Sequence, residues 1–227
     1  MHKDLYAGGK KLVSATSLPA IITKDFLERW KKDLCECIGC QDTPTSWDKP
    51  RAGKSGLCGT LLAKKVAEKA AEFSNVVHEE MAEWLKTGNL PEVPSEWTAK
   101  IISALKEGNT KAVLIDPETI LRWDEAMLSG SPDGVCEGFG KRFILDHKIK
   151  KSLDKLTGVQ GYIYRLLIKK NTGEDIRWML IAWGQVETGK VKLVWIDLNE
   201  WKAVTKALIL IWNTINPSRA IKLRGKS

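Results

Sequence analysis

The segment Ile144–Lys148 places an acidic and a basic side chain two positions apart, in the letters ILDHK. This short, mostly apolar run predicts a β-strand, and strand residues two apart point to the same face. Asp146 and Lys148 should therefore share one face. Because Phe143 and Leu145 are apolar, we expect the strand to be at least half buried. A buried carboxylate and a buried amine are costly unless they pair or bind an ion.

A second carboxylate, Asp133 in SPDGV, lies at the start of the preceding predicted strand. An antiparallel hairpin across the turn Glu137–Lys141 would bring Asp133 near Asp146. Two carboxylates that converge on one point repel each other, and a divalent cation relieves that repulsion. Oxygen ligands favour Mg²⁺ or Mn²⁺ over Zn²⁺. The two aspartates therefore predict a magnesium or manganese site.

Further polar side chains are placed on predicted helices. Gln160 and Tyr164 are one turn apart and share a helix face, and His78 lies on an amphipathic helix. Taken singly, His78 is more simply a packing residue, and Gln160 and Tyr164 are ordinary helix surface. Asp146 and Lys148 could likewise be a surface pair worth at most about 1 kcal/mol. The ordered combination of these residues is what argues for one site.

The ordered set of SPDGV, LDHK and Gln160-x3-Tyr164 resembles the PD-(D/E)XK nuclease superfamily. The Gln-x3-Tyr pattern and the upstream helical histidine narrow the resemblance to the RecB-like branch. Within that branch, the order of motifs is similar to that of the mitochondrial genome maintenance exonucleases and their phage and bacterial relatives. The resemblance spans nearly the whole chain, and the matching positions are Thr16–Ser17, Trp30, His78, Glu118, Asp133, Asp146–Lys148 and the closing strands within Arg177–Asp197.

The resemblance implies metal-dependent hydrolysis of phosphodiester bonds, which needs an activated water and a stabilised anionic transition state. Asp133, Asp146 and the backbone carbonyl of His147 would hold the metal ion. His78 would complete the metal site, as the helical histidine of the family does. Lys148 would orient or help to deprotonate the attacking water and offset the developing charge.

The same resemblance implies roles for three further residues. The outer acidic group would be Glu118 or Asp116. Glu118 fits better, because the family usually shows Glu a few residues into this strand, although Pro117 between the two blurs the register. Gln160 and Tyr164 would position a phosphate or the surroundings of the metal.

The expected function is that of a Mg²⁺- or Mn²⁺-dependent deoxyribonuclease, and more narrowly of an exonuclease that acts on single-stranded DNA or duplex ends. It would serve replication, recombination or repair in a bacterial, archaeal or phage- or virus-infected cell. The first alternative is an endonuclease or junction resolvase on the same fold. The second is a catalytically silent nucleic-acid-binding module, against which the intact Asp133, Asp146 and Lys148 argue.

The charge balance agrees with an acidic partner. A net charge of +8, from 36 Lys and Arg against 28 Asp and Glu, favours nucleic acid first and an anionic membrane second. Lys150, Lys151 and Arg165 border the site and are candidates for binding the substrate backbone. No apolar run approaches the roughly 18 residues that a membrane helix needs, and the first residues lack the apolar region of a secretory signal. We therefore expect a cytoplasmic protein without a membrane partner.

Four of the five cysteines precede the predicted catalytic segment, at Cys35, Cys37, Cys40 and Cys58. The run CECIGC invites a zinc or iron–sulfur interpretation. Its C-x-C-x2-C spacing, however, lacks the paired C-x2-C knuckles of common zinc sites. The related iron–sulfur nucleases of CRISPR systems carry one cysteine before the core and three after it, whereas here no cysteine follows Cys136. We therefore expect no iron–sulfur cluster and regard these cysteines as loop and core thiols.

Hydrophobic periodicity predicts the elements that must position these residues. Helices are predicted over Thr60–Lys86, Glu96–Lys106, Leu156–Ile168 and Asn199–Asn213. Strands are predicted in AVLIDPETIL, SPDGVCEG and RFILDHKI, and over Arg177–Gln185 and Val191–Asp197.

This order of elements predicts an α/β fold with one mixed central sheet flanked by helices, after a helical N-terminal region. The resemblance narrows it to a restriction-endonuclease-like fold. We expect a single nuclease domain over 1–227. Within it, 1–110 would be mainly helical and carry His78, and 111–227 would hold the catalytic sheet and the closing helix.

Overall fold

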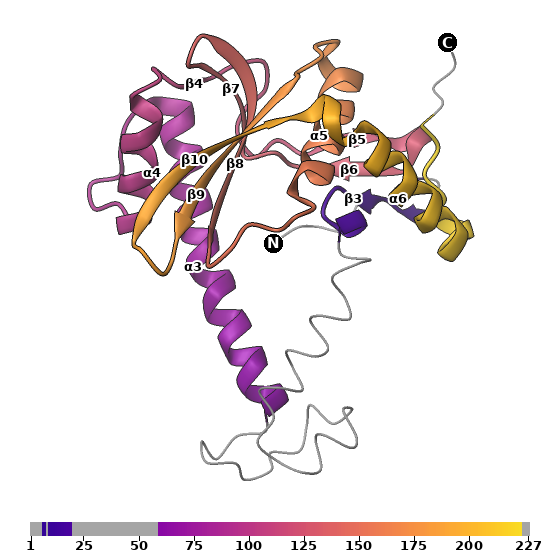
Figure 1. Cartoon of the computed structure of the whole chain (residues 1–227), viewed down its shortest axis with the longest axis horizontal. Helices are drawn as coiled ribbons and strands as arrows, with labels where there is room; N and C mark the ends of the chain where they lie inside the picture. Colours follow the sequence, from indigo (N-terminus) through magenta and orange to yellow (C-terminus); the bar gives the residue numbers. More distant parts are fainter. Residues whose placement is uncertain (1–5, 8, 20–58, 224–227) are drawn as a thin grey trace. The chain divides into compact units, whose positions relative to one another are not determined.

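The computed structural model describes residues 6–7, 9–19 and 59–223, and this part of the chain is a mixed α/β protein (Figure 1). The chain forms two compact units, one of Met1–Pro19 with Val77–Ser227 and the other of Ala20–Val76. The site residues expected from the sequence belong to the first unit. No helix within the described residues is both long enough and apolar enough to cross a membrane.

A five-stranded mixed sheet in the order β10-β9-β8-β7-β4 forms the centre of the first unit. Its strands are β4 (Lys111–Ala112), β7 (Gly134–Gly138), β8 (Lys141–Lys150), β9 (Trp178–Gln185) and β10 (Lys190–Asp197). The pairs β7–β8 and β9–β10 are antiparallel, whereas β8 and β9 run parallel. Parallel neighbours need a crossover connection, and helix α5 (Thr157–Thr172) supplies it.

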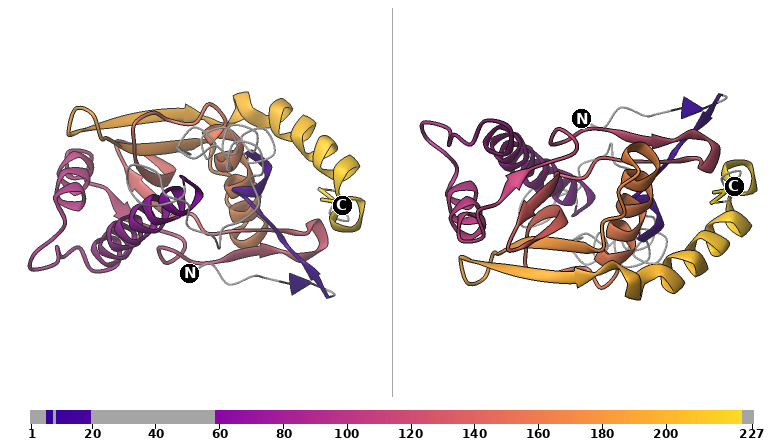
Figure 2. Two further views of the ribbon diagram at one scale, coloured as in Figure 1. Left: turned by 90° about the horizontal axis from the view of Figure 1, so that it is seen from below. Right: turned by 90° about the horizontal axis from the view of Figure 1, so that it is seen from above.

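Helices cover both faces of this sheet (Figure 2). The part of α3 (Gly59–Thr87) from Val77 onward and α4 (Glu96–Lys106) pack on one face, while α5 packs on the other. The chain closes with α6 (Lys202–Ile215), which packs against α5. Short 3₁₀ helices complete the structure at η1 (Asp124–Ala126), η2 (Leu198–Trp201) and η3 (Pro217–Arg219).

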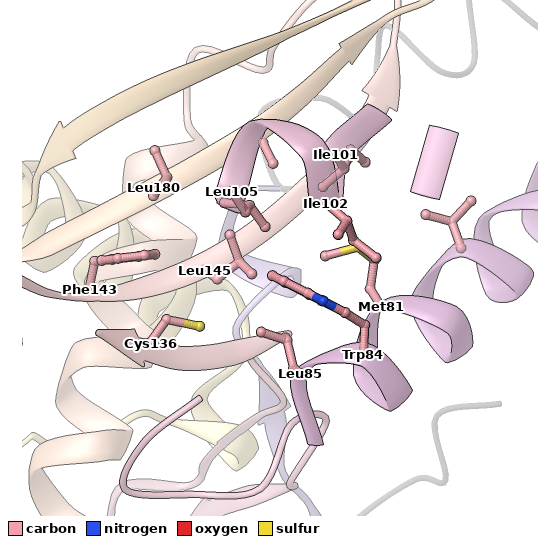
Figure 3. Packing of buried hydrophobic residues seen from close by; sticks show 12 residues of the cluster. Met81, Trp84, Leu85, Ile101, Ile102, Leu105, Cys136, Phe143, Leu145 and Leu180 are labelled. Carbon is pink, nitrogen blue, oxygen red and sulfur yellow. The ribbon is translucent and has the colours of Figure 1, made fainter. Parts of the chain in front are cut away.

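The main core lies between the sheet and the helices α3 and α4 (Figure 3). The helices contribute Met81, Trp84, Leu85, Ile101, Ile102 and Leu105, and the strands contribute Cys136, Phe143, Leu145, Leu180 and Ala182. Because side chains alternate along a strand, Phe143 and Leu145 of β8 face this core, and Ile144 and Asp146 face α5. The strand β8 is thus buried on both faces, and it presents polar groups to both.

A second sheet was not predicted. Strands β5 (Leu121–Trp123) and β6 (Leu128–Gly130) are antiparallel, and β3 (Val13–Ser14) joins β6 in parallel. A separate ribbon pairs β1 (Tyr6–Ala7) with β2 (Lys10–Lys11). The prediction of one sheet was therefore incomplete, because strands of two or three residues are too short to show a periodicity.

The segment AVLIDPETIL, predicted as a strand, is mostly turns. Only its first residue continues β4, and only its last begins β5. Between them, the amide of Ile115 donates to the carbonyl of Val113 (2.8 Å), and the amide of Thr119 donates to that of Asp116 (3.2 Å). The prediction failed here because Pro117 has no amide hydrogen to give to a ladder. The remaining predicted helices and strands of the described residues are confirmed, with shifts of a few residues at their ends.

Candidate metal centre and active site

The hairpin β7–β8 brings the two predicted aspartates together. Its register pairs Gly134 with Leu145, so Asp133 lies next to Asp146 just beyond the last pair, as predicted. Both carboxylates are buried. The backbone amide of His147 donates a hydrogen bond to Oδ2 of Asp133 (2.7 Å). The Asp133 carboxylate therefore accepts a backbone hydrogen bond of β8 just beyond the point where β7 begins at Gly134.

Helix α3 and the turn after β4 add His78 and Glu118 on the same side. Nδ1 of His78 lies 2.9 Å from Oε1 of Glu118 and 3.4 Å from Oδ1 of Asp133. The hydroxyl of Ser131 donates to Oε2 of Glu118 (3.4 Å). The alternative outer acid, Asp116, contributes its backbone carbonyl to the turn by accepting the amide of Thr119. Of the two acids considered from the sequence, Glu118 is thus the one that contacts His78.

The side chain of His147 is also part of this group. Phe143, Leu145 and His147 alternate onto the α3 face of β8, and the His147 ring packs against the ring of His78 with centroids 4.1 Å apart and a tilt of 47°. Its Nδ1 lies 2.7 Å from Oδ2 of Asp133. One ligand atom from each of His78, Asp133 and His147 lies within 4.8 Å of the other two, close enough for the three to hold one metal ion.

On the other face of β8, Asp146 and Lys148 meet helix α5, as their spacing predicted. Nζ of Lys148 lies 2.8 Å from Oδ2 of Asp146 and donates to Oε1 of Gln160 (3.3 Å). Nε2 of Gln160 donates to Oδ1 of Asp146 (3.4 Å) and to the hydroxyl of Tyr164 (2.9 Å). The four side chains form one polar network, and Gln160 is its centre.

The two aspartates differ electrostatically. Burial works against ionisation of Asp133, but His147 and His78 outweigh it and hold the pKa of Asp133 below its usual range. Burial raises the pKa of Asp146; Lys148 opposes that rise, and the charge of Asp133 adds to it. The site therefore contains carboxylates that repel each other, which is the situation that a bound cation relieves.

The basic groups of the site are held in their charged forms. Burial opposes the imidazolium of His78, but Asp133 and Glu118 outweigh it and raise the pKa of His78 to about 10. Burial likewise opposes the ammonium of Lys148, but Asp146 raises the pKa of Lys148 above its ordinary value. A metal ion at this position would displace the proton of His78, since imidazole binds metals in its neutral form.

The three basic residues expected to bind substrate are placed differently. Lys150 follows on β8 and is half-buried; burial, and then Lys148, lower the pKa of Lys150. Lys151 is exposed and pairs with Glu187 (2.8 Å). The side chain of Arg165 is largely buried and already bonded to other side chains.

The Nε of Arg165 lies 2.5 Å from Oδ1 of Asp175, and its Nη1 donates to Oδ1 of Asn199 (2.6 Å). These bonds direct the Arg165 guanidinium to the α5–β9 connection, away from the network around Gln160. Lys150 and Lys151 thus remain the stronger candidates for phosphate contacts.

Several residues named from the sequence lie outside the described residues: Trp30, Cys35, Cys37, Cys40 and Cys58. The fifth cysteine, Cys136, is a free thiol in the core, where burial, with a further contribution from Asp133, raises its pKa to about 12.

Sequence reasoning missed the imidazole of His147. The signal was present, because alternation places residue 147 on the face of Phe143 and Leu145, beside Asp133.

No known protein-family model matches the chain, and no curated protein sequence shows significant similarity to it. The chemistry of the site therefore has to be inferred from its own residues.

Proposed function

We propose that this chain is a metal-dependent deoxyribonuclease of the RecB-like branch of the PD-(D/E)XK nucleases, and that it acts as an exonuclease. One observation carries the proposal: two buried aspartates meet at the open end of a β-hairpin, with a lysine on the same strand face. His78 and Glu118, from two other elements, converge on the first aspartate. Buried charges in such a number are costly, and a catalytic centre is the usual reason to keep them.

The fold supports the same proposal. A restriction-endonuclease-like fold requires an antiparallel hairpin, a helical crossover and a further strand parallel to the second strand of the hairpin, with helices on both faces. Here these elements are β7–β8, α5 and β9. The second catalytic motif lies at the middle of β8, and Gln160 and Tyr164 lie on the crossover helix that follows it. The motifs thus lie on the elements that the proposed fold assigns to them.

The donor set fits a divalent cation. Carboxylate and imidazole groups are its usual ligands, and both ring nitrogens of His147 lack a hydrogen-bond partner within the described part of the chain. Asp133 and His78 would be ligands, together with Asp146 and the backbone carbonyl of His147. A bound ion would polarise the scissile phosphate and make water nucleophilic at neutral pH.

Lys148 acts on the reacting groups in this proposal. Asp146 holds its amine as an ammonium, so Lys148 is suited to donate hydrogen bonds to the attacking water and to the phosphoryl oxygens. An ammonium cannot itself take a proton, so Lys148 is better suited to orienting water than to removing its proton. Gln160 fixes both groups, because its amide oxygen accepts from Lys148 and its amide nitrogen donates to Asp146.

DNA is the substrate that the charge favours. The chain carries a net charge of +8; Lys150 ends β8 two positions after Lys148, and Lys151 follows it. Basic groups in this position would bind the phosphates that flank the scissile bond.

Digestion of labelled DNA tests this proposal. End-labelled linear duplex, single-stranded and covalently closed circular DNA should be incubated with Mn²⁺, Mg²⁺ or excess EDTA. We expect cleavage of linear DNA with metal, none in EDTA, and resistance of the closed circle. Lys148→Ala should lower turnover roughly 10²–10³-fold, as removal of a transition-state donor does, while DNA binding persists.

Lys192→Ala is the matched control, because Lys192 is an exposed strand lysine on β10 and should leave turnover unchanged. Cleavage of the closed circle would instead indicate an endonuclease. Activity that survives EDTA, or a Lys148→Ala protein with normal turnover, would refute the assignment. A wild-type protein that binds DNA without cutting it under any metal would indicate a silent binding module.

A further inference from the structure

The imidazole of His147 is an unusual side chain for its position. Alternation along β8 makes it the next member of the row Phe143 and Leu145, which is otherwise part of the apolar core against α3 and α4. The residue is only 5% exposed. A polar ring at the end of an apolar row needs partners for its two nitrogens, since a buried polar group without them destabilises the fold.

Those partners are missing among the described residues. Nδ1 of His147 lies 2.7 Å from Oδ2 of Asp133, but in an orientation that makes no hydrogen bond, and Nε2 has no hydrogen-bond partner either. Oδ2 of Asp133 is instead bonded by the backbone amide of His147. The ring therefore offers unused nitrogen atoms beside a buried carboxylate.

The neighbours of this ring explain what it could bind. The ring of His78, from α3, packs against it with centroids 4.1 Å apart, and ligand atoms of His78, Asp133 and His147 lie within 4.8 Å of one another. We propose that the side chain of His147 is a metal ligand, and that the two imidazoles make this a site for a divalent first-row transition ion rather than for Mg²⁺. The inference rests on the proposed function for the use of a metal, but its test does not require hydrolysis.

The chemistry of the ligands sets the preference. Magnesium binds hard oxygen ligands and is held mainly by carboxylates and water. Imidazole nitrogen favours transition ions, and manganese accepts both oxygen and nitrogen ligands. With a site of Asp133 and the carbonyl of His147 alone, Mg²⁺ would compete well. With two imidazoles beside Asp133, Mn²⁺ or Co²⁺ should bind much more tightly than Mg²⁺.

Metal binding to the full-length protein, without DNA, tests this inference. Titration calorimetry should give the ratio of Mg²⁺ to Mn²⁺ dissociation constants for the wild type, His147→Leu and Phe143→Leu. Leucine resembles histidine in volume, so His147→Leu removes the ligand and keeps the core filled. We expect His147→Leu to weaken Mn²⁺ binding by more than the roughly 10–100-fold that loss of a ligand's outer partner costs, and to change Mg²⁺ binding far less. Phe143→Leu alters the same row of β8 without touching a ligand and should leave the ratio unchanged.

A spectroscopic measurement on the wild type removes the dependence on a folded variant. Electron spin-echo envelope modulation of bound Mn²⁺ detects coordinated nitrogen, and we expect two imidazole nitrogens in the wild type and one in His78→Gln. Modulation from one imidazole or none in the wild type, or an unchanged ratio in folded His147→Leu, would overturn the inference. If the wild type binds Mn²⁺ through two imidazoles and yet cuts no DNA, only the proposed nuclease function fails. If it cuts DNA while His147→Leu keeps the metal preference, only the role of His147 fails.

Discussion

Nδ1 of His78 lies 2.9 Å from Oε1 of Glu118, although 40 positions separate the two residues in the chain. The backbone of Glu118 has a φ angle of 60°, in the left-handed region that residues other than glycine seldom adopt. Such a conformation costs on the order of 1–3 kcal/mol and persists only where the surroundings enforce it. The fold thus retains a strained turn that directs this carboxylate to His78.

Glu118→Gln should therefore impair the site while the neighbouring Asp116→Asn does not. The amide of glutamine keeps the size of the side chain but removes the charge that fixes His78. We expect Mn²⁺ affinity and turnover on linear DNA to fall roughly 10–100-fold in Glu118→Gln, as for loss of an outer partner of a metal-ligating histidine. Both variants should unfold at similar temperatures without metal. Equal activities would show that Glu118 is only a structural feature of the turn.

Much of this site could be predicted because it depends on local geometry. The spacing of Asp146 and Lys148 determines that they share a strand face, and a short hairpin turn determines that Asp133 meets Asp146. Gln160 and Tyr164 share a helix face for the same kind of reason. Each of these relationships involves residues within one element or across one turn, where chain geometry leaves few alternatives.

The network on α5 predicts graded effects of substitution. Gln160 contacts Asp146, Lys148 and Tyr164, so Gln160→Ala should lower kcat roughly 10²-fold through loss of the group that fixes Lys148. Tyr164→Phe removes one hydroxyl that accepts from Gln160, and it should cost only about 3–10-fold, the value of one hydrogen bond. Steady-state kinetics on a labelled single-stranded oligonucleotide would measure both. A Tyr164→Phe effect as large as that of Gln160→Ala would mean that the phenol acts on the substrate itself.

Gly130 leaves room for the ring of Tyr164. A Cβ atom at residue 130 would lie 2.7 Å from Cε1 of Tyr164 and 3.1 Å from Cβ of Ala15. Because that ring is buried, Gly130→Ala should destabilise the fold by about 1–3 kcal/mol, as overpacking does. Urea unfolding would measure the loss. Tyr164→Ala should largely remove the penalty of Gly130→Ala, so the double variant should be clearly non-additive. Additive losses would exclude this clash as the cause.

The features that could not be predicted depend on distant parts of the chain. Strand β3 pairs with β6, with Val13 opposite Leu128 from a distant part of the sequence, and neither strand is long enough to show alternation. The resemblance placed His78 and Glu118 at one site, but their direct contact depends on the turn after β4, whose left-handed residues leave no pattern that sequence periodicity detects. For His147 the strand pattern was sufficient, but the resemblance assigned that position only a backbone role.

The ion pair of Arg165 with Asp175 gives a prediction for stability against pH. The hydrogen bond from Arg165 lowers the pKa of Asp175; burial opposes this shift, and a further hydrogen bond from Lys169 adds to it, so that the pKa falls from 3.8 to about 2. A carboxylate whose pKa is lower in the folded state contributes stability above its unfolded pKa. That contribution is lost as the pH falls through the folded value. Because the side chain of Asp175 is 39% exposed, water screens the pair, and its contribution should stay below about 1 kcal/mol.

Asp175→Asn should therefore be less stable than the wild type at pH 5–7, and the difference should shrink between pH 4 and pH 2. Urea unfolding at each pH measures it, and 1 M salt at neutral pH should reduce the same difference by screening the pair. Turnover on DNA should change little, because Arg165 stabilises the α5–β9 connection and is not directed to the network around Gln160. A folded Asp175→Asn protein that binds DNA more tightly, with a steeper dependence on salt, would show the opposite. In that case Arg165, once released from Asp175, would be a phosphate-binding residue after all.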